Sequence, residues 1–113
     1  SSINKHKDMA EDIRVNELKD KMEAGEDFKL LDVREAHERE QFNIGGSFIP
    51  LGALMSRIGE LEAHKEDEVI VYCRSGNRSG LAKEFLERAG FKNVRNLLGG
   101  MLDWAEAYGT DHK

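Results

Sequence analysis

The sequence predicts a single α/β domain with a central, mostly parallel sheet of about five strands flanked by helices. Two observations carry this prediction. Short apolar segments with strand character alternate along the chain with segments of helical spacing, an order typical of parallel sheets. The run Val69-Ile70-Val71-Tyr72 is apolar without interruption, which suits a strand covered on both faces. With 113 residues, the chain can bury roughly two-thirds of its unfolded surface and fold without disulfides.

The expected boundaries of the domain follow changes in polarity. Residues 1–12 are polar and charged without a clear hydrophobic period, so we expect them to form a flexible N-terminal arm or a loosely docked turn. The folded domain is expected over residues 13–109, and residues 110–113 are expected to form a C-terminal tail.

Two strand and helix pairs are expected in the first part of the domain. Residues 13–15 give a short alternating strand pattern, and Asn16 is the expected N-cap of a helix over residues 17–24. Residues 28–33 form a second apolar strand. Residues 35–42 are compatible with a helix and rich in charges of alternating sign, so we expect their side chains to form a solvated face.

The same alternation continues to the end of the chain. The apolar period and the positions of glycine and proline define the elements. In order, they are a short strand around residues 48–49 ended by Pro50, an amphipathic helix over residues 54–61, the apolar strand over residues 69–72, a helix that begins at residues 77–79 and ends before Gly90, a strand over residues 94–98, a turn at Gly99-Gly100, and a terminal helix over residues 101–108 ended by Gly109.

The loop Cys73-Arg74-Ser75-Gly76-Asn77-Arg78-Ser79 joins the apolar strand to the next helix. It places the only cysteine at the carboxyl end of a parallel strand, where ligands bind in open α/β sheets. A thiolate is favoured by nearby cations, by a helix N-terminus and by convergent backbone N–H groups. Arg74 and Arg78 supply positive charge, and Gly76 allows the backbone to turn its N–H groups inward. The loop therefore predicts a reactive thiol in an anion-binding cradle.

Asp32 and Arg34 follow the preceding strand and are expected at the same edge of the sheet as Cys73. We interpret them as an ion pair or turn cap that supports the following loop, because a thiolate surrounded by cations needs no additional acid. The four histidines lack ligand spacing, and the chain has too few cysteines for a cysteine-based zinc site. No metal or cofactor is expected.

The composition restricts the partners and the compartment. A formal net charge of -5 argues against nucleic acid, whose binding proteins gather basic residues on one face. A single cysteine excludes an intrachain disulfide and fits a reducing compartment. No secretory or membrane-spanning apolar run is visible. We expect a cytoplasmic domain whose partner is a small molecule or another protein.

Three stretches resemble one family. The loop Cys73–Ser79 is similar to the active-site loop of single-domain rhodaneses. Leu30-Leu31-Asp32-Val33-Arg34-Glu35 resembles the first motif of that family, and Asn96-Leu97-Leu98-Gly99-Gly100 with Trp104 resembles its closing motif. Ile44-Gly45-Gly46-Ser47-Phe48-Ile49-Pro50-Leu51 departs from the commoner Gly-His-Ile-Pro-Gly-Ala pattern. It is closer to the rhodanese domains appended to ubiquitin-activating-like sulfur-carrier enzymes.

The resemblance implies a sulfurtransferase without a cofactor. A sulfane sulfur would pass from an anionic donor such as thiosulfate to a persulfide on Cys73, and then to cyanide, a thiol or a sulfur-carrier protein. The remaining residues of the loop would bind the donor: Arg74, Ser75, Gly76, Asn77, Arg78 and Ser79. Because the loop is similar to thiosulfate-type loops at Arg74, thiosulfate is the expected donor.

There are four alternatives to this function, and two of them are disfavoured by the sequence. Cysteine phosphatases place an arginine six positions after the cysteine, where this chain has Ser79; Arg78 at the fifth position implies a tighter loop. Arsenate reduction usually passes through a disulfide, and no second cysteine is present. The other two alternatives stay open: a non-catalytic interaction module of rhodanese shape and a protein-to-protein sulfur carrier. The complete loop around Cys73 favours a catalytic function over the interaction module.

Overall fold

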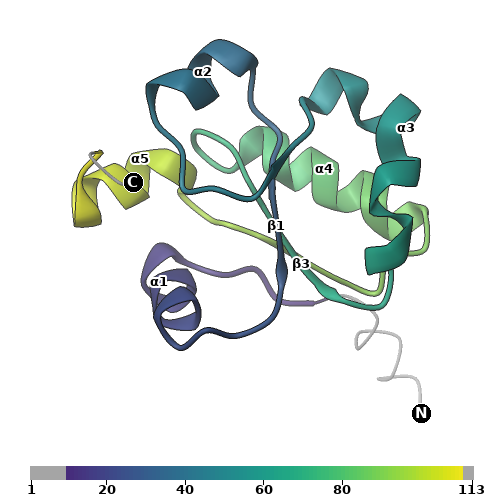
Figure 1. The fold of residues 1–113 in the computed structure, drawn as a ribbon, viewed down its shortest axis with the longest axis horizontal. Coiled ribbons are helices and arrows are strands. Elements are labelled where there is room, and N and C mark those ends of the chain that lie inside the picture. The colour runs from purple at the N-terminus through teal and green to yellow at the C-terminus, as the bar shows by residue number, and fades with distance from the viewer. Residues whose placement is uncertain (1–9, 111–113) are drawn as a thin grey trace.

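The computed structural model describes residues 10–110, which fold around a parallel four-stranded sheet of order β2-β1-β3-β4 (Figure 1). This confirms the predicted α/β domain with a parallel sheet, with four strands in place of about five. The elements are α1 (Val15–Glu23), β1 (Lys29–Asp32), α2 (Ala36–Gln41), β2 (Ser47–Phe48), η2 (Leu51–Ala53), α3 (Leu54–Arg57), η3 (Ile58–His64), β3 (Glu68–Tyr72), α4 (Asn77–Arg88), β4 (Asn93–Asn96) and α5 (Gly100–Tyr108).

The expected first strand is reduced to a single residue. Ile13 makes one isolated parallel bridge with Leu97, and α1 already begins at Val15 with Arg14 at its N-cap. The prediction of Asn16 as the N-cap is therefore wrong. Glu17 lies three positions after Arg14, and its carboxylate accepts a hydrogen bond of 3.0 Å from the Arg14 N–H, an interaction that favours the earlier helix start.

Two apolar clusters lie on opposite faces of the sheet. Side chains of β3 alternate between them, as the period of a strand requires. Val71 packs in the cluster that includes Leu86 of α4, whereas Ile70 packs in the cluster that includes Leu18 of α1 and Trp104 of α5. Figure 1 shows α3 and α4 on one side of the sheet and α1 on the other. Helices on both faces explain why the sequence of β3 is continuously apolar.

The predicted helix over residues 54–61 is broken. Only the four residues of α3 are α-helical, and the chain continues as the 3₁₀ helix η3 to His64. Gly59 weakens the α-helix at this point, and Arg57 pairs with Glu60 at 2.9 Å, a spacing of three residues that suits a 3₁₀ turn. Leu54 and Leu61 are buried, so the apolar spacing correctly identified the inward side.

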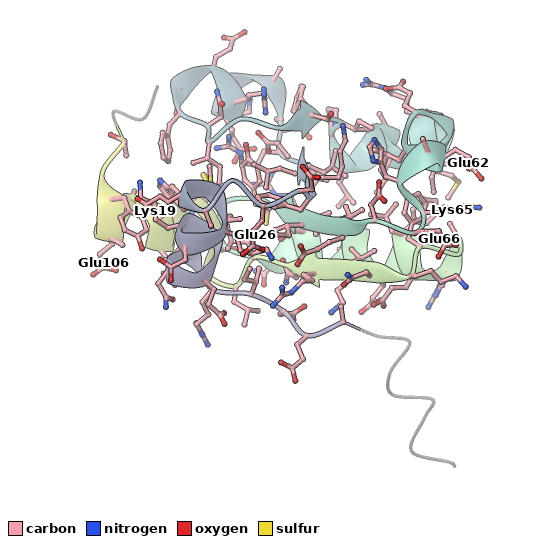
Figure 2. The ribbon with its side chains drawn as sticks, turned by 60° about the horizontal axis from the view of Figure 1, so that its bottom comes forward. Lys19, Glu26, Glu62, Lys65, Glu66 and Glu106 are labelled. Atoms are coloured by element: carbon pink, nitrogen blue, oxygen red, sulfur yellow. The ribbon has the colours of Figure 1, made fainter. Side chains whose placement is uncertain are left out.

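Exposed charges of both signs are interspersed over the domain (Figure 2). Several form ion pairs within one element or between close neighbours, such as Lys19 with Glu23 at 3.7 Å and Lys65 with Glu62 at 3.0 Å. Pairs of this kind contribute little to stability. None of the helices within residues 10–110 combines the length and the apolar character needed to cross a bilayer.

The described end of the expected N-terminal arm lies against α4 and β4. Lys83 donates to the carbonyl of Ala10 at 2.8 Å and to the carboxylate of Asp12 at 2.6 Å. Arg95 donates to the carbonyl of Glu11 at 2.8 Å. The rest of that arm, residues 1–9, and the end of the expected tail, residues 111–113, lie outside the described residues.

Candidate functional site

The carboxyl ends of β1, β3 and β4 form one edge of the sheet. The register pairs Asp32 with Tyr72, and Val71 with Asn96, so the residues that follow each strand lie close together. Cys73 comes directly after β3 and is buried, with 1% of its surface exposed. The chain then turns into α4 at Gly76, whose φ of 104° is left-handed. Glycine adopts this conformation at no steric cost, which allows α4 to start beside the sulfur.

Three donors converge on the Cys73 sulfur. The N–H of Gly76 lies 3.1 Å away, the N–H of Ser79 lies 3.3 Å away, and the Ser79 hydroxyl also lies at 3.3 Å. Burial raises the pKa of the thiol, but hydrogen bonds from Ser79, Gly76 and Ser75 together outweigh this effect. The pKa of Cys73 is therefore lowered. The arrangement stabilises a negative charge on the sulfur.

The first turn of α5 binds two backbone carbonyls of the loop that carries Cys73. The N–H of Met101 donates to the carbonyl of Cys73 at 3.0 Å, and the N–H of Leu102 donates to the carbonyl of Arg74 at 2.9 Å. This close approach requires Gly100, because a Cβ there would lie 2.4 Å from the Cys73 carbonyl oxygen. The Gly99-Gly100 turn was expected only as a connection. It also lets the start of α5 come close enough to bind the loop.

Arg78 is engaged by a carboxylate. Its guanidinium makes two hydrogen bonds to Glu38 of α2, at 2.7 and 2.8 Å. The hydrogen bond from Arg78 is the main cause that lowers the pKa of Glu38 to about 2. Arg39 on the same helix donates to Asp32 at 3.2 Å. The expectation that the charges of residues 35–42 form only a solvated face is therefore wrong. Helix α2 lies over the end of the sheet, where Glu38 pairs with Arg78 of α4 and Arg39 pairs with Asp32 of β1.

Arg74 has a different environment. Its side chain is exposed, and the structure gives it no ion-pair partner among residues 10–110. With Arg34, Phe42 and Leu102, it lines a pocket of ≈ 230 Å³ between α2 and α5. The lining also includes Glu38, which is paired with Arg78, while Arg34 is paired with Asp32. Arg74 is therefore the one charged residue of this pocket without an ion-pair partner among residues 10–110, and it offers an anion a place beside the loop that carries Cys73.

Asp32 and Arg34 form a buried ion pair at the end of β1. Arg34 Nε and Nη2 each lie 2.9 Å from a carboxylate oxygen of Asp32. Nη2 also donates to the carbonyl of Phe42 at 2.7 Å. Burial opposes the charge of Arg34, but the hydrogen bonds and charge of Asp32 prevail, and the pKa of Arg34 is raised. The pair joins the end of β1 to the end of α2 and holds the segment between them.

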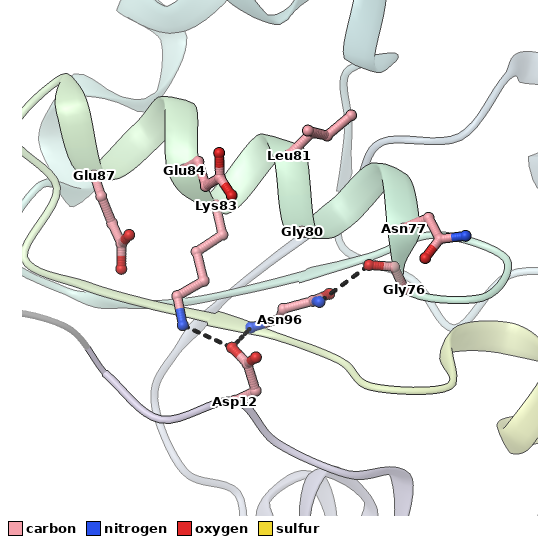
Figure 3. Close-up of a pocket in the computed structure, with 9 residues that line it drawn as sticks. All are labelled: Asp12, Gly76, Asn77, Gly80, Leu81, Lys83, Glu84, Glu87 and Asn96. Carbon is pink, nitrogen blue, oxygen red and sulfur yellow. Dashed lines mark hydrogen bonds and ion pairs between the residues drawn. The ribbon is translucent and has the colours of Figure 1, made fainter.

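Asn96 is a member of this site that the sequence reasoning did not single out. Its side-chain Nδ2 donates to the carbonyl of Gly76 at 3.0 Å, and its Oδ1 accepts from the Ser79 hydroxyl. Its backbone N–H donates to Asp12 at 3.1 Å, and Figure 3 shows Asn96 between Gly76 and Asp12. The position of Asn96 at the end of the strand beside β3 was the available signal, because polar residues at this edge lie next to the ligand site.

His37 and His64 are the histidines that the structure describes. Within the part of the chain that the structure describes, no three residues of the His, Cys, Asp and Glu types come together in a metal-binding group. His64 contacts Asp67 at 3.0 Å on the surface. His6 and His112 lie outside the described residues.

The geometry agrees with a known family. The sequence profile described as "Rhodanese-like domain" matches residues 14–107. The chain belongs to the rhodanese-like domain family. This confirms the resemblance that the three motifs indicated. A crystal structure of a rhodanese-like domain protein from Staphylococcus aureus superposes with a TM-score of 0.79 at 27% identity, covering 93% of this chain and 99% of that chain.

Two curated relatives align with this chain over part of their own length. YrkF of Bacillus subtilis, provisionally named a sulfur carrier protein, is 39% identical over 94 residues, which are 82% of this chain and 50% of YrkF. A mitochondrial protein of Schizosaccharomyces pombe, provisionally named a thiosulfate sulfurtransferase, is 37% identical in an alignment of 89 positions that covers 68% of this chain and 63% of the relative. The chain therefore spans half of the first relative and under two-thirds of the second.

Proposed function

We propose that this rhodanese-like domain is a sulfurtransferase that carries a sulfane sulfur on Cys73. The geometry around the sulfur carries the proposal: the Gly76 and Ser79 N–H groups donate to Cys73 and the Ser79 hydroxyl lies within hydrogen-bond distance, so the buried thiol is prepared to be anionic. The family match and the names of the two relatives support sulfur chemistry as the use of that anion.

The first step would load the sulfur. The Cys73 thiolate attacks the outer sulfur of thiosulfate, a new S–S bond forms, and the bond to the sulfonate breaks so that sulfite leaves with the electron pair. The negative charge then resides on the outer sulfur of a Cys73 persulfide. Backbone N–H groups of the loop can stabilise this charge as they stabilise the thiolate.

Arg74 would bind the anionic donor. It is exposed beside the pocket between α2 and α5 and has no ion-pair partner among the described residues. Arg78 would have a positioning role instead, since Glu38 already compensates its charge and the pair attaches α2 to the start of α4. Ser75 and Asn77 would border the entrance, because both are exposed next to Cys73 in the loop.

The second step would deliver the sulfur to a nucleophile such as cyanide, a small thiol or a sulfur-carrier protein. The nucleophile attacks the outer sulfur, and the Cys73 thiolate leaves with the electron pair of the S–S bond. A second candidate function, transfer between proteins only, is favoured by the name of YrkF and by Leu102, which is 46% exposed beside Arg74 at the pocket. An exposed apolar residue next to an exposed arginine suits contact with a protein surface.

Intact-mass measurement tests the proposal directly. After incubation with thiosulfate, the protein should gain the mass of one sulfur atom on Cys73 and lose it when cyanide is added. The Cys73→Ser variant is the control and should gain nothing. If the native protein gains no sulfur from thiosulfate but gains it from a persulfide-bearing protein, the donor assignment fails and the carrier function stands. If neither donor loads Cys73, sulfur transfer is refuted.

A further inference from the structure

The Ser79 hydroxyl lies between two groups that both need its single proton. Its oxygen is 3.3 Å from the Cys73 sulfur and makes a short contact with Oδ1 of Asn96. All three side chains are buried, with Ser79 at 0% and Asn96 at 7% exposed. A hydroxyl has one hydrogen to donate, so it cannot serve the sulfur and the amide oxygen at the same time.

The orientation of the Asn96 amide decides where that proton rests. Nδ2 donates to the carbonyl of Gly76 at 3.0 Å. Turning the amide over would place Oδ1 against this carbonyl, where two acceptors would repel each other. Oδ1 therefore faces Ser79, and because it can only accept, the hydroxyl must be the donor. The Asn96 backbone is itself fixed by Asp12, which pairs with Lys83 (Figure 3).

We propose that Asn96 is a positioning residue that competes with Cys73 for the Ser79 proton. While the sulfur of Cys73 is neutral, the hydroxyl donates to Asn96. When negative charge develops on the sulfur, the hydroxyl rotates and donates to it, and the bond to Asn96 is given up. The loss of that bond is part of the cost of ionising the thiol, so Asn96 limits how far Ser79 can lower that cost.

This exchange suits a sulfur whose charge changes during a reaction, and that use rests on the proposed sulfur transfer. In the persulfide, the charge resides on the outer sulfur and the inner sulfur of Cys73 is neutral, so Ser79 can return to Asn96. When the acceptor attacks, the inner sulfur leaves as thiolate. The hydroxyl can then donate to the inner sulfur as the charge develops. A donor placed where charge develops stabilises the transition state.

The test measures the pKa of Cys73 from its alkylation rate as a function of pH in four proteins: the native chain, Ser79→Ala, Asn96→Ala and the double variant. We expect Ser79→Ala to raise the pKa. Asn96→Ala should lower it, with an increase in the ionisation constant of about fivefold, the equivalent of one ordinary hydrogen bond. In the Ser79→Ala background, the Asn96 substitution should change nothing, because no proton remains to compete for.

A merely structural Asn96 gives a different pattern. Loss of its bond to Gly76 would loosen the cradle and raise the pKa of Cys73 whether or not Ser79 is present. A rise, no change, or a shift of equal size in both backgrounds overturns the proposal. If Asn96→Ala does not fold, Asn96→Leu has nearly the shape of Asn without an acceptor and should show the same Ser79-dependent fall. The assay contains no sulfur donor or acceptor, so its outcome is independent of whether Cys73 forms a persulfide.

Discussion

The ion pair between Glu38 and Arg78 makes a prediction about stability that can be worked out from the structure. Hydrogen bonds from Arg78 lower the pKa of Glu38 from 4.5 to about 2. At 1.36 kcal/mol per pKa unit, this difference corresponds to roughly 3 kcal/mol of stability at neutral pH. The side chains are 18% and 33% exposed, and solvent screening reduces the value to about 1–2 kcal/mol.

The pH dependence follows from the direction of the shift. The folded state holds Glu38 ionised at a lower pH than the unfolded chain does, so the stabilisation is complete above the ordinary pKa of 4.5. It declines as the pH falls toward the folded pKa of about 2, and by pH 3 less than about half remains. Replacing Glu38 with Gln removes the titrating group and with it this part of the acid sensitivity.

Urea unfolding of the native chain and of Glu38→Gln at pH 7 and pH 3 measures the effect. The variant should be less stable by about 1–2 kcal/mol at pH 7, and the difference should shrink at pH 3. Glu60→Gln is the matched control, because its pair with Arg57 is exposed and should leave the stability unchanged. A difference between native chain and variant that stays constant from pH 7 to pH 3 would refute the reasoning.

Three further predictions concern the reactivity of the site. The pKa of Cys73, measured by thiolate absorbance, should lie below the free-cysteine value of about 8.5, since the hydrogen bonds outweigh burial; a value at or above it would indicate an inert thiol. Arg74→Ala should raise KM for thiosulfate more than it lowers kcat, whereas Arg88→Ala, on an exposed arginine of α4, should change neither; a fall in kcat alone would assign Arg74 to the transition state. The native protein should release no phosphate from aryl phosphates beyond the Cys73→Ser blank, because Arg78 is held by Glu38 and is not free to clamp a phosphate; release that depends on Cys73 and matches the rate of sulfur transfer would contradict this.

The parts of the fold that could be predicted are those with local causes. A strand buried on both faces has a continuous apolar sequence, and Gly90 marks the end of α4 because its φ of 103° is one that glycine adopts easily. The first strand and its helix were misplaced because residues 13–15 are too few to establish a ladder. The start of α1 instead depends on Glu17, which reaches the backbone of Arg14.

The charges of α2 show where sequence reasoning must fail. A helix with alternating charges has the same pattern whether its acids face water or another element. Glu38 is 40 positions from Arg78 in the chain, and only the packing of α2 over the sheet edge brings them together. The two arginines of the loop, which look equivalent in sequence, therefore differ in the folded domain: Arg78 is paired with Glu38, and Arg74 has no ion-pair partner among residues 10–110.

The cradle around Cys73 depends both on local sequence and on packing between distant parts of the chain. Its donors are local, since Gly76 and Ser79 lie three and six positions from the cysteine. The orientation of these donors toward the sulfur depends on residues far away in the sequence, which bind the carbonyls of the loop. Helix α5 binds the carbonyls of Cys73 and Arg74, and Asn96 binds the carbonyl of Gly76. A loop with these residues but without α5 and β4 would be free to turn its N–H groups toward water. The motif therefore identifies the nucleophile, while the closing segment of the chain, residues 96–102, makes the loop an anion-binding site.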